Sequence, residues 1–306
     1  MTTKAMNAPL QKGKSRLNRN NGWDYLMIGV LVLFALICVY PFWYVVIGSF
    51  SDGADYMRGG VYLWPREWSL QNYQVTLVDS RLWIGFRVTI ARTFICTITH
   101  VLFTAMVAYA MSRSDLPCRK FIYWFNMFTM FFGGGLIPTY LLMVQLGFVN
   151  SFAVYIIPGL FSAYYMLLAS SYMESIPSAL FESARIDGAS ETRTFASIAL
   201  PLAKPMLACI AVYIGVGHWN SWFDVSLYSK NGAWDTLQII LYRLLNQANA
   251  KSDMFNQQQL YASMRTIQPE TVRAAITIVV VVPILFIYPF FQRYFVGGIT
   301  LGAVKG

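Results

Sequence analysis

The sequence has little charge for its length. Only 12% of its 306 residues are Asp, Glu, Lys or Arg, and 57% are hydrophobic. Soluble globular domains carry about 25% charged residues, so a water-soluble fold of this size lacks the polar side chains to cover its surface. Disorder is excluded as well, because 16% of the residues are aromatic. The class that remains is an integral membrane protein.

The residue patterns of most enzyme and metal sites are also missing. The four cysteines lie far apart in apolar surroundings, without a C-x-x-C pair, at Cys38, Cys96, Cys118 and Cys209. This spacing excludes a disulfide framework and a zinc site. The two histidines, His100 and His218, each stand alone among apolar or aromatic neighbours, so we expect satisfied or pathway-lining groups. We predict no catalytic residue and no metal site.

Nucleotide-binding motifs are absent too. No G-x-x-x-x-G-K-[ST] pattern occurs, and the Gly-rich stretch 297–306 lacks the spacing of a phosphate-binding loop. We therefore predict no cofactor in this chain. The net charge is +9, but the basic block near the N-terminus has no aromatic interleaving and runs into an apolar segment, so nucleic acid is not a predicted partner.

Long hydrophobic runs are what the sequence does have. A hydrocarbon core of about 30 Å requires about 20 apolar residues as helix. Six stretches qualify, at 26–50, 84–111, 121–144, 152–172, 206–225 and 274–296. Alternating strands typical of a membrane barrel are absent. The sequence predicts an all-α membrane protein with six transmembrane helices over residues 26–306, preceded by a basic tail at 1–25.

The orientation follows from Lys and Arg in the loops. The tail carries Lys4, Lys12, Lys14, Arg16 and Arg19, the loop after the second span carries three basic residues, and the loop after the third span carries none. This asymmetry predicts a cytoplasmic N-terminus and, with six spans, a cytoplasmic C-terminus. The basic residues of 226–273 conflict with that orientation, but the charge rule weakens in a loop of this length.

The cytoplasmic loop 173–204 is too long for a simple turn. Pro177 suits a first helical turn, and Gly188 suits the end of the helix that follows. Ser190 is a plausible N-cap for a second helix ending before Pro201. From the residues alone, an ordinary amphipathic linker on the lipid headgroups is an alternative.

Within this loop, Glu182-Ser183-Ala184, three residues, Gly188, nine residues and Ile198-x-Leu200-Pro201 resemble the "EAA" loop of binding-protein-dependent ABC importer permeases. The family pattern is E-A-A-x3-G-x9-I-x-L-P. Ser183 departs from it by replacing one small residue with another. The residues that the resemblance assigns to ATPase coupling are Glu182, Ser183, Ala184, Asp187, Gly188, Ala189, Ile198, Leu200 and Pro201.

The resemblance covers nearly the whole chain. Segments 40–42, 108–113, 219–220 and 302–306 look like the maltose-type carbohydrate permeases. The run Phe131-Phe132-Gly133-Gly134-Gly135-Leu136-Ile137-Pro138-Thr139-Tyr140 is similar to a subgroup linked to complex oligosaccharides and polysaccharide fragments. The first 22 residues lie outside the resemblance.

The resemblance implies an inner-membrane permease subunit of a bacterial carbohydrate importer. The loop 173–204 then forms a coupling helix that sits in a cleft of a partner ATPase. The implied partners are a second homologous permease, two copies of an ABC ATPase that bind ATP and Mg, an extracytoplasmic solute-binding protein and membrane lipid. Both termini are expected in the cytoplasm.

Polar groups inside spans are costly and usually face a pathway. The candidate substrate-pathway residues are Arg92, Asn126, Thr129, Tyr165, His218, Trp219, Asn220 and Asp224. An aromatic belt at the membrane interface is the alternative for the residues near 219. Arg92 lies deep in its predicted span and should face protein or water. This position suits either helix packing against a carboxylate or recognition of an acidic oligosaccharide such as a uronate.

Three rival functions stay open on the residues. An ABC permease for another solute, such as a peptide or amino acid, would carry the same coupling loop. An ion-coupled secondary transporter would have six spans but no need of that loop. A membrane-embedded enzyme would require a paired nucleophile and base, which the sequence does not offer.

Overall fold

The computed structural model describes residues 22–246 and 268–303, with side-chain positions as far as Phe286. Within these ranges the chain is helical, and the β interaction it contains is an isolated bridge between Ser51 and Trp68. The helical class predicted from the sequence is therefore correct. The tail before Gly22, much of the predicted loop 226–273 and the C-terminal Lys305 lie outside the described residues.

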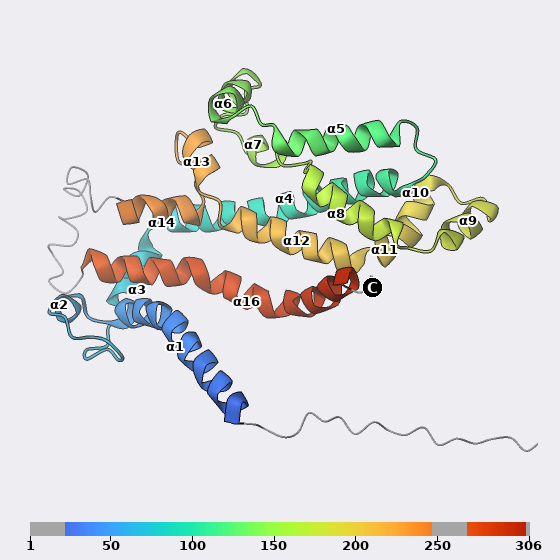
Figure 1. Ribbon diagram of the computed structural model, residues 1–306. Coiled ribbons are helices and arrows are strands. Elements are labelled where there is room, and N and C mark those ends of the chain that lie inside the picture. Colours follow the sequence, from blue (N-terminus) through green and yellow to red (C-terminus); the bar gives the residue numbers. More distant parts are fainter. Residues whose placement is uncertain (1–21, 247–267, 304–306) are drawn as a thin grey trace, which may run out of the picture.

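Four helices form the centre of the fold (Figure 1). They are α4 (Ser80–Ser112), α8 (Ala163–Glu174), α12 (Lys204–Trp219) and α16 (Pro269–Ala303). Helix α4 packs against both α8 and α12, and α12 packs against α16. Helix α1 (Gly22–Phe50) contacts α16, but its first two-thirds are exposed and run away from the bundle.

Short helices gather at the two ends of this bundle (Figure 1). One end holds α9 (Ser178–Ile186), α10 (Glu191–Thr194), a π-helical turn at Phe195–Ala199 and α11 (Leu200–Leu202). The opposite end holds α2 (Gly53–Met57), α3 (Gln71–Val78), α13 (Phe223–Tyr228) and α14 (Leu237–Asn246).

In the described part of the chain, three helices are long and apolar enough to cross a membrane, within α1, α4 and α16. Two bent helix pairs raise the number to five if each pair is one span. The predicted first, second and sixth spans coincide with these three helices. A polytopic membrane protein follows, whereas the number six stays a prediction.

The predicted third span at 121–144 is two helices, not one. Helix α5 (Arg119–Phe131) and helix α6 (Leu136–Gln145) meet at 111°. The three glycines at 133–135 separate them, and Gly135 has φ +81°. Glycine adopts this backbone conformation without a steric penalty, so this run breaks the helix despite its apolar flanks.

The predicted fourth and fifth spans are shorter as helices than their apolar runs. The run 152–172 divides into α7 (Ala153–Ile156) and α8, because Pro158 and Gly159 lie between them. Helix α12 ends at Trp219 rather than at residue 225. At its start, α12 makes a 78° bend with Glu191–Leu202.

The sequence predicts that the helix beginning after Ser190 ends before Pro201, but in the structure it is longer. It continues through the π-helical turn into α11 and ends at Leu202. Pro201 lies near the end of this continuous helix, directly after the π-helical turn. A π-helical turn of this kind is frequent at functional sites.

Candidate functional site

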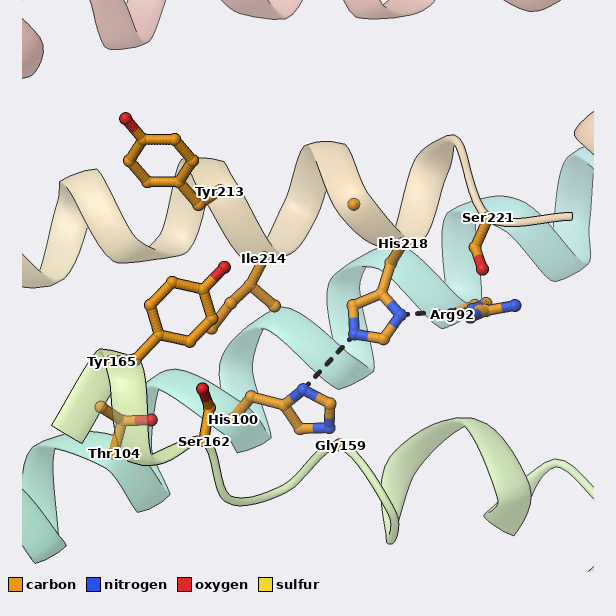
Figure 2. A pocket seen from close by; sticks show the side chains of 11 residues that line it. Arg92, His100, Thr104, Gly159, Ser162, Tyr165, Tyr213, Ile214, His218 and Ser221 are labelled. Atoms are coloured by element: carbon orange, nitrogen blue, oxygen red, sulfur yellow. Dashed lines mark hydrogen bonds between the residues drawn. The ribbon is translucent and has the colours of Figure 1, made fainter. Parts of the chain in front are cut away.

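A hollow of about 260 Å³ lies between α4, α8 and α12, beside the segment that follows α7 (Figure 2). Its lining is rich in hydroxyl and imidazole groups. It consists of Arg92, His100, Thr104, Gly159, Ser162, Tyr165, Tyr213, Ile214, Gly217, His218 and Ser221.

Helix α4 supplies one wall through residues spaced four apart. Arg92, Cys96, His100 and Thr104 are all buried, and this spacing places them on one face of a helix. Three of the four line the hollow. The series was readable in the sequence, because its period is helical and all four side chains are polar or contain sulfur.

Arg92 carries a buried positive charge. Its side chain is 2% exposed and forms an ion pair with Asp224. The guanidinium carbon also lies 4.1 Å from the centre of the Tyr155 ring, a cation–π distance. Asp224 accepts two further hydrogen bonds, from the Ser221 hydroxyl at 2.5 Å and the Val225 backbone N–H at 2.9 Å. The cost of burying the charge is thus offset by pairing.

A chain of hydrogen bonds runs from Arg92 through both histidines (Figure 2). Arg92 Nε donates to His218 Nδ1 at 3.3 Å, His218 Nε2 lies 3.3 Å from His100 Nδ1, and His100 Nε2 lies 2.9 Å from the Ile156 carbonyl oxygen. Arginine only donates and a carbonyl only accepts. We therefore assign the proton to Nε2 of each ring, with both imidazoles neutral.

The two histidines stand alone in the sequence, but the fold brings their rings together, and both are hydrogen-bonded and line the hollow. Cys96, His100 and His218 also offer ligand atoms within 4.8 Å of one another, as a metal site requires. In the hydrogen-bonded arrangement, however, the Nδ1 lone pair of each ring already accepts a hydrogen bond. A metal would have to displace these bonds beside the Arg92 cation, so the donor set fits the hydrogen-bond chain better.

Gly159 permits His100 to approach the loop. A Cβ atom added at residue 159 would lie 2.7 Å from His100 Cε1, closer than packed atoms allow. A larger residue at position 159 would therefore force the His100 ring to shift.

The predicted pathway residues separate into two groups. Arg92, Tyr165 and His218 line the hollow, and Asp224 pairs with Arg92. The other four lie elsewhere. The Trp219 indole donates to the Val280 carbonyl at 3.2 Å, the Asn220 side chain accepts from Gln238 at 3.2 Å, and Asn126 and Thr129 bond to carbonyls of their own helix α5.

The second candidate site is the segment α9–α11. Helix α9 buries Phe181 and Ala184 against the core, while Glu182, Ser183 and Asp187 are exposed. Ile186 is 86% exposed. The outer face of α9 is thus not covered by the described part of the chain.

Gly188 ends α9 in a left-handed conformation, with φ +74°. The backbone N–H of Ala189 donates to Ala184 O at 2.9 Å, and that of Gly188 donates to Arg185 O at 3.1 Å, which is typical of a glycine C-cap. Ser190 then caps α10 by accepting from Arg193 N at 3.3 Å. The two caps fix the reversal between the helices, as the sequence predicts.

Ion pairs join this segment to the nearby end of α4. Arg185 donates to Asp115 at 2.9 Å and to Glu191 at 3.1 Å, and the Tyr109 hydroxyl donates to Glu191 at 2.6 Å. The hydrogen bond from Tyr109, and then that from Arg185, lower the pKa of the Glu191 carboxyl. Arg185 likewise lowers the pKa of Asp115. Both carboxylates are therefore charged at neutral pH.

The end of the loop motif packs differently from its beginning. Ile198 and Leu200 are half-buried against a cluster that includes Ala199 and Ala203, and Pro201 is exposed. The first part of the motif, on α9, thus has an exposed face, whereas Ile198 and Leu200 near its end pack against the bundle.

A bundle of apolar helices around a polar hollow, with an anchored helical hairpin at one end, is the architecture of a membrane permease. Residues 82–300 match the family described as binding-protein-dependent transport system inner membrane component. The chain belongs to this family. It is a permease subunit and not an enzyme, as the sequence predicts.

Relatives and solved structures agree with this assignment. The chain is 32% identical to the polygalacturonan/rhamnogalacturonan transport system permease protein YtcP of Bacillus subtilis, over 94% of this chain and 100% of YtcP. It is 29% identical to the arabinooligosaccharides transport system permease protein AraQ of Halalkalibacterium halodurans, over 89% of this chain and 93% of that protein.

Among solved structures, a chain of a bacterial ABC transporter involved in the import of the acidic polysaccharide alginate superimposes with a TM-score of 0.84 and 29% identity. The match covers 89% of this chain and 96% of that one. The resemblance to importer permeases that the EAA loop indicates is thereby confirmed at the level of the family.

Proposed function

We propose that this chain is the transmembrane permease subunit of an ATP-driven importer that moves an oligosaccharide into the cytoplasm. An extracytoplasmic solute-binding protein delivers the sugar. The observation that carries the proposal is the anchored helix α9, whose outer face bears Glu182, Ser183 and Ile186 beside the glycine-capped turn. A coupling helix requires such an arrangement, because it can transmit a movement of the ATPase to the bundle only if it stays fixed on the bundle.

The proposed topology has six spans with both termini in the cytoplasm. The bent pair α5–α6, the pair α7–α8 and helix α12 would supply the third to fifth crossings. The α9–α11 end is then cytoplasmic and the α2–α3–α14 end is outside. The basic tail before Gly22 and the charge asymmetry of the short loops support this orientation.

The proposed coupling residues are the motif positions of loop 173–204. Glu182 would pair with a basic group of the ATPase, and Ser183 and Asp187 would lie in the same contact. Ala184, Ala189, Ile198, Leu200 and Pro201 would hold the hairpin on the bundle. ATP and Mg would be bound by the ATPase, since this chain has no phosphate-binding motif.

The proposed substrate is an oligosaccharide with acidic residues. YtcP is named for polygalacturonan and rhamnogalacturonan, and the similar transporter structure imports alginate. The hydroxyl-rich hollow beside Arg92 suits such a solute. Trp219 and Asn220 face α16 and α14, and Asn126 and Thr129 lie on α5, so these four would meet the substrate only if the helices move.

The full assembly would contain a second homologous permease, two ATPase subunits and the binding protein. An ATPase dimer offers two clefts, whereas this chain offers one coupling loop, so a pseudo-two-fold pair of permeases would complete the site. Membrane lipid would cover the remaining apolar surface.

Reconstituted uptake tests the proposal. In proteoliposomes with all four components, oligosaccharide uptake should require ATP and the binding protein. Glu182→Lys should abolish uptake and binding-protein-stimulated ATP hydrolysis together, because it places a like charge at the contact. Glu67→Lys, an exposed reversal at the opposite end, should still co-purify with the ATPase.

Three results would contradict the proposal. Uptake driven by an ion gradient without ATP would indicate a secondary transporter. Uptake of peptides but not of oligosaccharides would indicate another solute class. Labelling of single cysteines at Ser190 and Asn246 from the same side of the membrane would exclude the six-span topology.

A further inference from the structure

We infer that the hollow between α4, α8 and α12 is a subsite for the carboxylate of an acidic sugar residue, and that Arg92 is the group that receives it. The inference rests on the proposed function and adds to it the chemical feature that this subunit reads. It does not concern the binding protein, which selects the sugar outside the membrane.

The charge lining the hollow is the first argument. Of the described residues around it, Arg92 alone carries a full charge, and none is acidic. Asp224 pairs with Arg92 but does not line the hollow. Arg92 is therefore the member of the pair that borders the cavity, with a side chain that is 2% exposed against 33% for Asp224. In a site of low dielectric constant the attraction of its charge for an anion is stronger than in water.

The two histidines extend the positive potential. With a proton on each Nε2, every N–H along the chain points away from Arg92 and toward the Ile156 carbonyl. The bond dipoles add, because aligned hydrogen bonds polarise one another. Both Nδ1 lone pairs are engaged, so neither ring presents an unengaged lone pair that would repel a carboxylate. Both Nε2–H groups are engaged as well, so the charge that favours an anion at this wall is that of Arg92.

The remaining lining fits the rest of a sugar ring. Hydroxyl groups come from Thr104, Ser162, Tyr165, Tyr213 and Ser221. Hydroxyls both donate and accept, as sugar hydroxyls do, and the two tyrosines add ring faces for C–H contacts. Small-molecule pockets span about 300–1,000 Å³, and this hollow of about 260 Å³ lies below that range. Its size suits one ring of a chain that passes through.

A purely structural role for Arg92 is the competing explanation. The Arg92–Asp224 pair joins α4 to α13, and such a pair would hold the two elements together whatever the solute. A tie of this kind requires neither the row of aligned imidazoles nor a cavity on the arginine side. The two explanations differ in what happens to substrate preference when the pair is replaced by neutral groups.

The experiment compares two sugars that differ in charge. Trigalacturonate and its fully methyl-esterified form have the same rings, but the ester is neutral. Uptake of each is measured in proteoliposomes with the complete transporter. The binding protein is the same in every assay, so its own preference cancels when the acid-to-ester uptake ratio of a variant is divided by that of wild type.

The double variant Arg92→Gln/Asp224→Asn removes both charges without leaving one unpaired. We expect its acid-to-ester ratio to fall about tenfold or more, as for the loss of a hydrogen bond to a charged group. Arg87→Gln is the matched control on the same helix, because Arg87 is exposed and does not line the hollow. Its ratio should equal that of wild type.

Arg92→Lys decides the question if the double variant does not fold. It keeps the charge and the partner Asp224 but loses the planar fork and the Nε–H that starts the histidine chain. We expect a smaller fall of its acid-to-ester ratio, by about threefold. An unchanged ratio in whichever of the two variants folds would overturn the subsite and leave the proposed function intact. Failure of the wild-type complex to take up either sugar would instead contradict the proposed function.

Discussion

Two ion-pair networks lie along helix α4, and they differ in exposure. Within the helix Arg92 pairs with Asp224 and is 2% exposed. Beside its C-terminal end Arg185 of α9 pairs with Asp115 and Glu191 and is 55% exposed. The chemistry is similar, but the surroundings decide what each network does. The buried pair joins α4 to α13, whereas the exposed pairs hold the hairpin of α9 and α10 beside the end of α4.

The energetics follow from the surroundings. Exposed ion pairs contribute little, because water competes for both partners. A buried pair contributes little compared with an apolar replacement, but the loss of one partner is severe, since a charge is left without compensation. We therefore expect substitutions at the Arg92 network to change stability and substitutions at the Arg185 network to change coupling.

The largest expected effect is a difference in folding stability between variants that lose one carboxylate from the buried network or from the exposed network. Asp224→Ala should destabilise the protein by about 3–5 kcal/mol, the usual cost of leaving a buried charge unpaired. Asp115→Ala removes a carboxylate of the same kind from the exposed network and should leave stability unchanged. Thermal unfolding of the detergent-solubilised complex, followed by size-exclusion chromatography, measures both.

The double variant Arg92→Gln/Asp224→Asn sharpens this result. It should recover most of the stability lost in Asp224→Ala, because neither residue is charged any longer. If Asp224→Ala and Asp115→Ala melt at the same temperature, the buried network does not differ energetically from the exposed one.

A second, smaller effect concerns the space around the buried network. Gly159→Ala places a methyl group against His100 and should destabilise the protein by about 1–3 kcal/mol, as overpacking does. Gly217→Ala is its control, because an added Cβ there meets nothing within 4 Å. Equal melting temperatures for the two variants would mean that His100 moves aside freely.

The loop beside the exposed network was easier to locate in the sequence than the hollow beside the buried one. Loop positions from Glu182 to Pro201 follow a motif with fixed spacing, so a linear pattern identifies them, although their coupling role stays a prediction. The hollow is assembled from helices far apart in the chain, and Arg92 and His218 are 126 residues apart. Contacts between distant helices cannot be read from local periodicity. The four-residue period of Arg92, Cys96, His100 and Thr104 indicates only the wall that α4 contributes.

Helix breaks were the other failure of sequence reasoning. Apolar runs predicted the long helices α1, α4 and α16 correctly, since a run of that length has few alternatives. In 121–144 and 152–172, hydropathy outweighed the local signals of Gly133–Gly135 and Pro158-Gly159. Glycine and proline act on the backbone and not on hydropathy, so an average over the run conceals them.

The third prediction concerns the turn at Gly188, which reverses the chain between α9 and α10 beside the exposed network. Gly188→Val places a β-branched residue at φ +74° and should cost about 1–2 kcal/mol locally. The variant should be made in normal amount but lose stimulated ATP hydrolysis, because α9 no longer points outward. Gly188→Asn is the control, since asparagine tolerates the left-handed region. Wild-type hydrolysis in Gly188→Val would exclude a coupling role for this turn.

The smallest effect is the pH response of the exposed network. Hydrogen bonds from Tyr109 and Arg185 hold the Glu191 pKa below its ordinary value of 4.5, and Arg185 holds the pKa of Asp115 below its ordinary value of 3.8. A carboxyl with a lowered pKa stabilises the fold above its ordinary value, and this contribution is lost as the pH falls through the lowered value. The loop should therefore keep one arrangement from pH 8 to about pH 5 and loosen only below about pH 4.

A spin label at Ser183→Cys reports this loosening of the loop as increased mobility of the label. In the Glu191→Gln background the label should be more mobile at every pH and respond less to acid. A transition near pH 6.5 would instead assign the response to a histidine, and both histidines belong to the buried network.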